Sequence, residues 1–564
     1  MRTLARAFLS FLFLLLLARP LRADELDDLA HDFWAWRAAE MPVSNDDIPR
    51  LERPAGWVPD WSPAAVAHYL AELDRFEARW KQFNAAGWPV PRQVDYHLIG
   101  SAIARVRWEL VVNAEWKRNP DFYLDQTIGA YVALLLQPPP FDPARSAQIL
   151  ATLGSFPRTL EAARKNLTQA TAPFAGLALD RLQDPRTALL KSAAALKPLL
   201  ASESANELDA ASEAAVRALA EYRIWLTEKL PSLPNETAVG RDSYLFFLKN
   251  VALLPYTPEQ LLEIGRQEWA RSVAWETFEQ HRNTGFPQLS LLPDEQAQIA
   301  REARDEAAIR RFLEANDILT VPAWVQHYVF RPMPAYLGVF HGSAGEEDDF
   351  TSPSRLRDDG IRYINPPAPN LAYFTDTMAK DPRCITVHEG VPGHYFQLVL
   401  SWRHPDPIRR HYYDSGANEG IGFYAEEMML QAGLFDDSPR TREIIASFAR
   451  LRALRVEVDV KLALGQFSLD EAAGYLRRSV PMDPRTAHSE AAFFAASPGQ
   501  AISYQIGKVQ ILRMLADARR TQGAAFSLRA FHDFVWLNGN VPLALQRWEY
   551  LGLRDDLDSA ARLR

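Results

Sequence analysis

Two histidines and a glutamate stand close together in the segment VHEGVPGHYFQ, which covers residues 387–397. Imidazole nitrogens and carboxylate oxygens are ligands that zinc favours, and a catalytic zinc site combines three protein ligands with one position for water. His388 and His394 could supply two of these ligands. Glu389 is too close to His388 in sequence to be a convenient third. It suits the role of general base, which takes a proton from the water that attacks a carbonyl.

A third ligand has to come from another part of the chain. Glu419 follows His394 by 25 positions, in the segment NEGIGFYAEEMM at residues 418–429. We expect it to lie just before an amphipathic helix. The intervening segment has a proline-rich break at residues 404–407, where a turn is expected. One helix, a turn and the start of another helix therefore fit between His394 and Glu419.

The spacing of the two histidines does not fit a regular helix. Zinc-binding helices separate their histidines by four positions, whereas His388 and His394 are six apart. At about 100° per residue, six positions leave two side chains about 120° apart. Pro392 removes a backbone donor, and Gly393 permits unusual dihedral angles. We therefore predict a helical bulge that brings both histidines to one ion.

Several motifs occur in an order that resembles one bacterial family. The chain contains HEGVPGH at 388–394, EG at 419–420, FYAE at 423–426 and PGQAISYQIGK at 498–508, with GRDSYL at 240–245 and LPYTPEQLLEIG at 254–265 upstream. This set is similar to the family designated domain of unknown function 885 (DUF885), over roughly residues 25 to 560. That family is grouped with helical zinc metallopeptidases of the gluzincin type.

The resemblance implies a role for individual residues. It implies three ligands to a single zinc ion: His388, His394 and Glu419. It implies that Glu389 is the catalytic base, that Glu426 orients a ligand histidine, and that Tyr504 donates a hydrogen bond to the developing oxyanion. Ligands of mixed nitrogen and oxygen also suit manganese, cobalt or iron, so the sequence leaves the identity of the ion open.

The rest of the chain has the pattern of a helical protein. Apolar residues recur three and four positions apart in residues 63–86, 206–230 and 257–280, which predicts amphipathic helices. Strand patterns are few, and the best lie near residues 323–330 and 360–364. We predict a mainly α fold, a large helical body with a small β-sheet near the metal site. The resemblance implies in addition a deep cleft.

The N-terminus and the composition limit the location and the partners. Residues 1–23 have a basic start, a short apolar middle and a small residue at the break, which is typical of a secretory signal peptide. We predict a secreted or periplasmic protein without membrane attachment after cleavage, with an N-terminal helical region at 24–239 and a metal-binding catalytic region at 240–564. The net charge of −9, with no basic stripe, argues against nucleic-acid binding. The oligomeric state stays open.

These patterns predict a secreted zinc-dependent metallohydrolase, a peptidase that acts on short peptides. Two alternatives remain. A non-catalytic peptide- or metabolite-binding protein on the same helical fold would need no turnover, and the altered histidine spacing favours it. An acid–base hydrolase such as a glycosidase would pair Glu389 with Glu419 or Glu426, and would leave both histidines unexplained.

Overall fold

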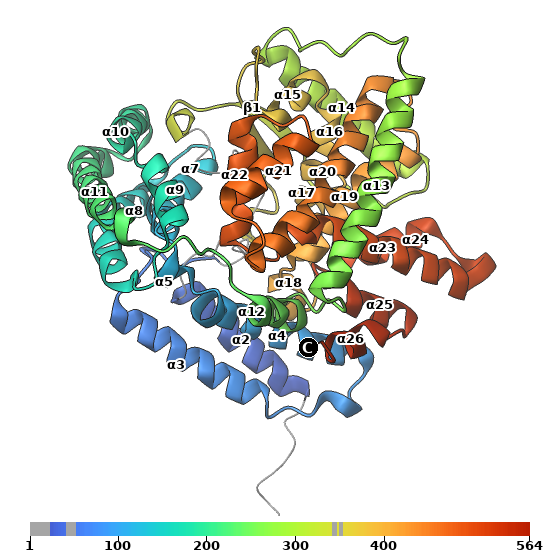
Figure 1. The fold of residues 1–564 in the computed structure, drawn as a ribbon, viewed down its shortest axis with the longest axis horizontal. Coiled ribbons are helices and arrows are strands. Elements are labelled where there is room, and N and C mark those ends of the chain that lie inside the picture. The colour runs from blue at the N-terminus through green and yellow to red at the C-terminus, as the bar shows by residue number, and fades with distance from the viewer. Residues whose placement is uncertain (1–22, 41–51, 341–346, 349–352, 564) are drawn as a thin grey trace, which may run out of the picture.

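Helices make up most of the chain in the computed structural model, which describes residues 23–40, 52–340, 347–348 and 353–563 (Figure 1). The prediction of a mainly α fold is confirmed. The predicted signal peptide lies outside the described residues except for Ala23, where the first described helix begins. Within the described ranges, no helix combines the length and the apolar character needed to cross a bilayer.

The N-terminal helices lie along the left and the bottom of the molecule in Figure 1. They are α2 (Ala23–Ala39), α3 (Pro63–Trp80), α4 (Val90–Arg107), α5 (Glu115–Arg118), α6 (Phe122–Leu124), α7 (Ala130–Leu136), α8 (Pro143–Asn166), α9 (Ala172–Arg181), α10 (Pro185–Leu196) and α11 (Ser202–Lys229). The predicted helix at 206–230 is confirmed as α11. The one at 63–86 ends earlier, at Trp80, and Asn84 caps a separate 3-10 turn by accepting a hydrogen bond from the backbone N–H of Ala86.

The remaining helices include the histidine segment and the helices that pack against it. They are α12 (Arg241–Phe246), α13 (Pro258–Arg282), α14 (Glu295–Ala315), α15 (Tyr373–Lys380), α16 (Arg383–Ile385), α17 (His394–Trp402), α18 (Pro407–His411), α19 (Ser415–Gln431), α20 (Pro439–Ala463), α21 (Leu469–Ser479), α22 (Pro484–Ala496), α23 (Gln500–Gln522), α24 (Leu528–Leu537), α25 (Leu543–Leu551) and α26 (Asp555–Ala560). Helix α13 confirms the prediction for 257–280, and its start carries a complete capping box between Thr257 and Gln260.

A small sheet lies against the histidine segment. Its strands are β1 (Tyr328–Pro332), β2 (Glu347–Asp348) and β3 (Gly360–Ile364), in the order β1-β3-β2, with β1 parallel and β2 antiparallel to β3. The predicted strand at 360–364 is confirmed, and the one at 323–330 is shifted to 328–332. The ring of Tyr328 packs so closely on Gly390 that an added Cβ there would lie 2.6 Å from it. The sheet therefore supports the segment between the histidines.

The hydrophobic core joins the two predicted regions of the chain. Its largest cluster contains Leu26 and Phe33 of α2 together with Ile408 of α18 and Val541 and Trp548 near the C-terminus. The division at residue 240 stays a prediction.

Two glycines allow α19 and α23 to touch. A Cβ added at Gly420 or at Gly507 would lie 2.7 Å from the Cα of the other glycine. Such a distance is below any normal carbon–carbon contact, so the backbones meet without intervening side chains. This contact brings Glu419 on α19 towards the start of α23.

We expect Gly507→Ala to lower the free energy of unfolding by about 1–3 kcal/mol, because the methyl group forces two packed helices apart. Chemical denaturation followed by circular dichroism measures the change. Gly154→Ala is the matched control, because no atom lies within 4 Å of a Cβ at that exposed position in α8. An equal effect of the two substitutions would contradict the argument from close helix packing.

Candidate metal centre

The segment with the two histidines consists of two helical pieces. Helix α16 continues into a π-helical turn, Thr386–Gly390, and α17 begins at His394. The predicted irregularity is therefore present, but the expectation of one bulged helix is wrong. Residues 391–393 lie outside both helical pieces. The relative direction of the two histidine side chains is therefore not determined by the periodicity of one helix.

At Gly393 the backbone lies in direct contact with the backbone of His388. A Cβ there would overlap the carbonyl oxygen of His388, so only glycine fits. The preceding carbonyl, that of Pro392, accepts a hydrogen bond of 2.7 Å from the indole N–H of Trp536 on α24. With the turn held in this way, the ring centroids of His388 and His394 lie 4.7 Å apart.

Four of the predicted residues form one cluster. The possible ligand atoms of His388, Glu389 and His394 all lie within 4.8 Å of one another. Oε2 of Glu419 lies 3.1 Å from Nε2 of His394 and 3.6 Å from Nε2 of His388. The same nitrogen of each ring thus faces the same carboxylate. Two imidazole nitrogens and one carboxylate oxygen match the donor set of a catalytic zinc site.

Glu419 lies inside α19, and the expectation that it precedes the helix is wrong. The side chain of Asp414 accepts a hydrogen bond of 2.8 Å from the backbone N–H of Ala417 and caps the helix ahead of Glu419. As a result Glu419, Gly422 and Glu426 lie three and four positions apart, on one helix face.

Both imidazole rings rest directly on the backbone of α19. A Cβ at Gly422 would lie 3.0 Å from Cε1 of His394 and 3.1 Å from Cε1 of His388. Gly422 did not emerge from the sequence analysis. The signal that could have revealed it is its position between Glu419 and Glu426 on the same face.

Glu426 lies beside His388, one of the two histidines predicted to be ligands. Its Oε1 is 2.7 Å from Nδ1 of His388, and the side chain is fully buried. A carboxylate that accepts the Nδ1 proton leaves Nε2 of His388 available to a metal. Nδ1 of His394, by contrast, has no hydrogen-bond partner among the described residues.

The second oxygen of Glu419 is held from α23. The amide nitrogen of Gln500 lies 3.4 Å from Oε1 of Glu419, and the hydroxyl of Ser415 donates to the amide oxygen of Gln500 at 2.6 Å. The start of α23 is fixed in turn by Asp459, whose carboxylate accepts backbone N–H groups of Gly499 and Ala501. Sequence reasoning missed Gln500 as a functional residue, although its position four before Tyr504 could have indicated it.

Tyr504 lies one helical turn further along α23, at the edge of the cluster. Its ring lies nearly parallel to that of His388, at a centroid distance of 6.2 Å and an angle of 19°. The guanidinium of Arg455 lies 4.5 Å above the tyrosine ring. Burial and the charge of Glu419 raise the pKa of Tyr504 well above its ordinary value, so its hydroxyl keeps its proton. It can therefore act as a hydrogen-bond donor.

A family model described as a bacterial protein of unknown function (DUF885) matches residues 50–548. This chain belongs to the DUF885 family. No curated protein matches it.

Two solved structures share the fold of this DUF885 chain. One is a candidate lipoprotein of unknown function from Shewanella oneidensis, with 17% identity, a TM-score of 0.68, and coverage of 94% of this chain and 100% of that one. The other is a candidate lipoprotein from Colwellia psychrerythraea, with 16% identity, a TM-score of 0.73, and coverage of 95% and 99%. At these identities the likeness concerns the fold.

The charges of the cluster stabilise one another. Burial lowers the pKa of a histidine, but the hydrogen bonds with Glu419 and Glu426 outweigh it and raise the pKa of His388 to about 9. Burial raises the pKa of a carboxyl group, but the two histidines outweigh it, so the pKa values of Glu389 and Glu419 are lowered. In the metal-free chain, ionised carboxylates thus face protonated histidines.

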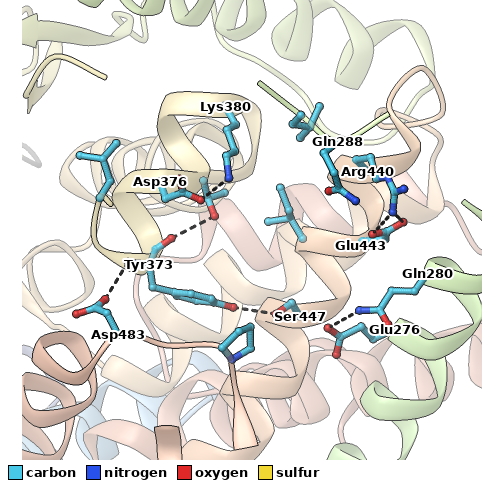
Figure 2. Close-up of a pocket in the computed structure, with 15 residues that line it drawn as sticks. Glu276, Gln280, Gln288, Tyr373, Asp376, Lys380, Arg440, Glu443, Ser447 and Asp483 are labelled. Carbon is cyan, nitrogen blue, oxygen red and sulfur yellow. Dashed lines mark hydrogen bonds and ion pairs between the residues drawn. The ribbon is translucent and has the colours of Figure 1, made fainter. Parts of the chain in front are cut away.

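A separate pocket of about 530 Å³ opens between α13, α15 and α20 (Figure 2). Two cations of its wall are paired with carboxylates of the same wall, Lys380 with Asp376 at 2.6 Å and Arg440 with Glu443 at 2.9 Å. None of the predicted site residues lines it. The predicted deep cleft stays a prediction.

We expect the affinity of the metal-free chain for zinc to rise with pH up to about 9. A proton on His388 competes with the ion, and the raised pKa means that the proton leaves only near pH 9. Affinity should fall by about tenfold per pH unit below that value for each proton displaced. Competition with a chromophoric chelator between pH 6.5 and 9 measures it. An affinity that is constant over this range would contradict the predicted protonation of His388.

Proposed function

We propose that this DUF885 chain is a zinc-dependent hydrolase that cleaves short peptides. The observation that carries the proposal is the convergence of both Nε2 atoms on Glu419, with Glu389 beside them. The proposed base is more exposed to solvent than the three proposed metal ligands. The side chain of Glu389 is 25% exposed, against 4%, 11% and 12% for His388, His394 and Glu419. The most accessible group is thus the one proposed to meet the substrate.

The donor set and its surroundings suit a divalent cation. Carboxylates bonded to the histidine Nδ1 and an amide bonded to the ligand carboxylate are typical supports for such a site, and Glu426 and Gln500 occupy these positions. A zinc ion held by His388, His394 and Glu419 would polarise a substrate carbonyl and make a water molecule more acidic.

The proposed reaction assigns the proton transfers to Glu389. Its lowered pKa keeps the carboxylate ionised at neutral pH, so it can accept a proton from the attacking water. The water oxygen bonds to the amide carbon, the carbon–nitrogen bond breaks, and Glu389 returns the proton to the departing nitrogen. The Tyr504 hydroxyl donates a hydrogen bond to the carbonyl oxygen as negative charge develops on it.

The proposed location is outside the cytoplasm. Residues 1–23 have the pattern of a secretory signal, and the two proteins that share the fold are described as candidate lipoproteins. We propose short peptides of the cell envelope or the medium as substrates. The paired-carboxylate alternative has less support, because Glu426 is fully buried and bonded to His388.

We expect Glu389→Gln to keep the metal and to lower peptide cleavage by about 100-fold or more, because the amide cannot accept the proton. Elemental mass spectrometry of protein purified without chelators measures the metal. Cleavage of a mixed peptide library, followed by liquid chromatography and mass spectrometry, measures activity. Zinc, manganese and cobalt forms are compared.

Two controls accompany this variant. Glu443→Gln removes a carboxylate that pairs with Arg440 in the separate pocket and should leave cleavage unchanged. His388→Ala/His394→Ala should lose both metal and cleavage. Full activity of the Glu389→Gln variant would exclude Glu389 as the base. A native chain that holds metal but cleaves no peptide would favour the binding-protein alternative.

A further inference from the structure

Arg452 on α20 is connected to the metal cluster through one carboxylate. Its Nη2 donates a hydrogen bond of 3.0 Å to Oε1 of Glu426. That same oxygen lies 2.7 Å from Nδ1 of His388. The position of Oε1 is therefore determined by two donors, one on α20 and one on the π-helical turn. The guanidinium and the imidazole thus share one acceptor atom.

The guanidinium is buried in an aromatic cage. Arg452 is 4% exposed, and its Cζ lies 4.8 Å from the ring centroid of Phe448 and 5.7 Å from those of Phe374 and Phe423. Rings at these distances attract a cation and limit its movement. A buried carboxylate such as Glu426 needs a counter-charge close by, and Arg452 supplies it. The cage therefore holds a charge at a defined place beside the cluster.

The neighbouring arginines on α20 have other partners. The guanidinium of Arg450 lies 3.0 Å from Glu276, in the wall of the separate pocket. Arg455 forms an ion pair with Glu490 and covers the ring of Tyr504. Of these three arginines, only Arg452 is hydrogen-bonded to a group that touches a proposed ligand.

We propose that Arg452 is a positioning residue that sets metal affinity by fixing Glu426, and through it the orientation of His388. With Glu426 accepting the Nδ1 proton, the lone pair of Nε2 points toward Glu419 and the proposed metal position. Without Arg452, Glu426 can rotate and His388 loses its fixed orientation. This inference rests on the proposed metal site but not on the proposed peptide cleavage.

The test measures zinc affinity of the full-length mature chain by competition with a chromophoric chelator. Arg452→Met keeps length and apolar packing in the aromatic cage but removes the charge and the hydrogen bond. We expect a loss of affinity of about 10- to 100-fold. Arg452→Lys keeps the charge and one donor, and should recover most of the affinity. Arg450→Met, two positions away, should bind zinc as the native chain does.

Two further measurements distinguish a positioning role of Arg452 from a purely structural one. In a Glu426→Gln background, Arg452→Met should cause little additional loss, because the connection is already broken. Cobalt substituted for zinc should show a changed visible spectrum in Arg452→Met and a native-like spectrum in Arg450→Met. If Arg452→Met does not fold, the lysine variant and the Glu426→Gln background decide the question.

The outcomes distinguish this inference from the proposed function. Native affinity in a folded Arg452→Met variant overturns the inference and leaves the metal site intact. Losses in Arg452→Met and Glu426→Gln that simply add would also overturn it, because Arg452 would then act by another route. A native chain that binds no zinc overturns the metal site and the inference together. Zinc binding without peptide cleavage affects the proposed function alone.

Discussion

The close backbone contact at Gly393 is the constraint on which the cluster of His388, Glu389, His394 and Glu419 depends. Because a Cβ there would overlap the carbonyl oxygen of His388, the backbone at residue 393 approaches that of His388 more closely than a residue other than glycine allows. His394 begins a new helix after this break, so the direction of its side chain is not determined by the π-helical turn that carries His388. Both rings can then face Glu419. The rest of the cluster is arranged around this pair.

Several distant segments hold the turn in place. Trp536 of α24 bonds to the carbonyl of Pro392, and Tyr328 of β1 packs on Gly390. On the other side, α19 presents the bare backbone of Gly422 to both rings. The small sheet thus has a definite function in a helical protein: it supports a segment that cannot satisfy its backbone as a continuous helix.

The cluster concentrates charge that would be costly without partners. Glu389, Glu419 and Glu426 lie around two histidines. Despite burial, these carboxylates raise the pKa values of His388 and His394, so protons on the histidines offset part of the negative charge in the metal-free chain. A divalent cation would supply the same balance. The proposed metal site is thus supported both by its nitrogen and oxygen donors and by the negative charge that a cation would balance.

The short-range features of this protein could be predicted from the sequence. His388, Glu389 and His394 lie within seven residues, and the proline and glycine between them predict an irregular backbone. Helix α13 follows from its apolar period and its capping box, which depend only on neighbouring residues. Glu426 and Tyr504 could be named because an ordered set of motifs resembles a family.

The contacts between helices were decided by the tertiary structure. The sequence predicts Glu419 ahead of its helix, whereas the cap formed by Asp414 places it inside α19. Three residues beside the cluster have their relevant neighbours at least 26 positions away in the sequence. Arg452 bonds to Glu426, Gln500 bonds to Glu419, and Gly422 packs against the rings of both histidines. Periodicity shows which face of a helix is apolar, but not which helix it meets. That choice arises only when all the apolar faces are packed into one core.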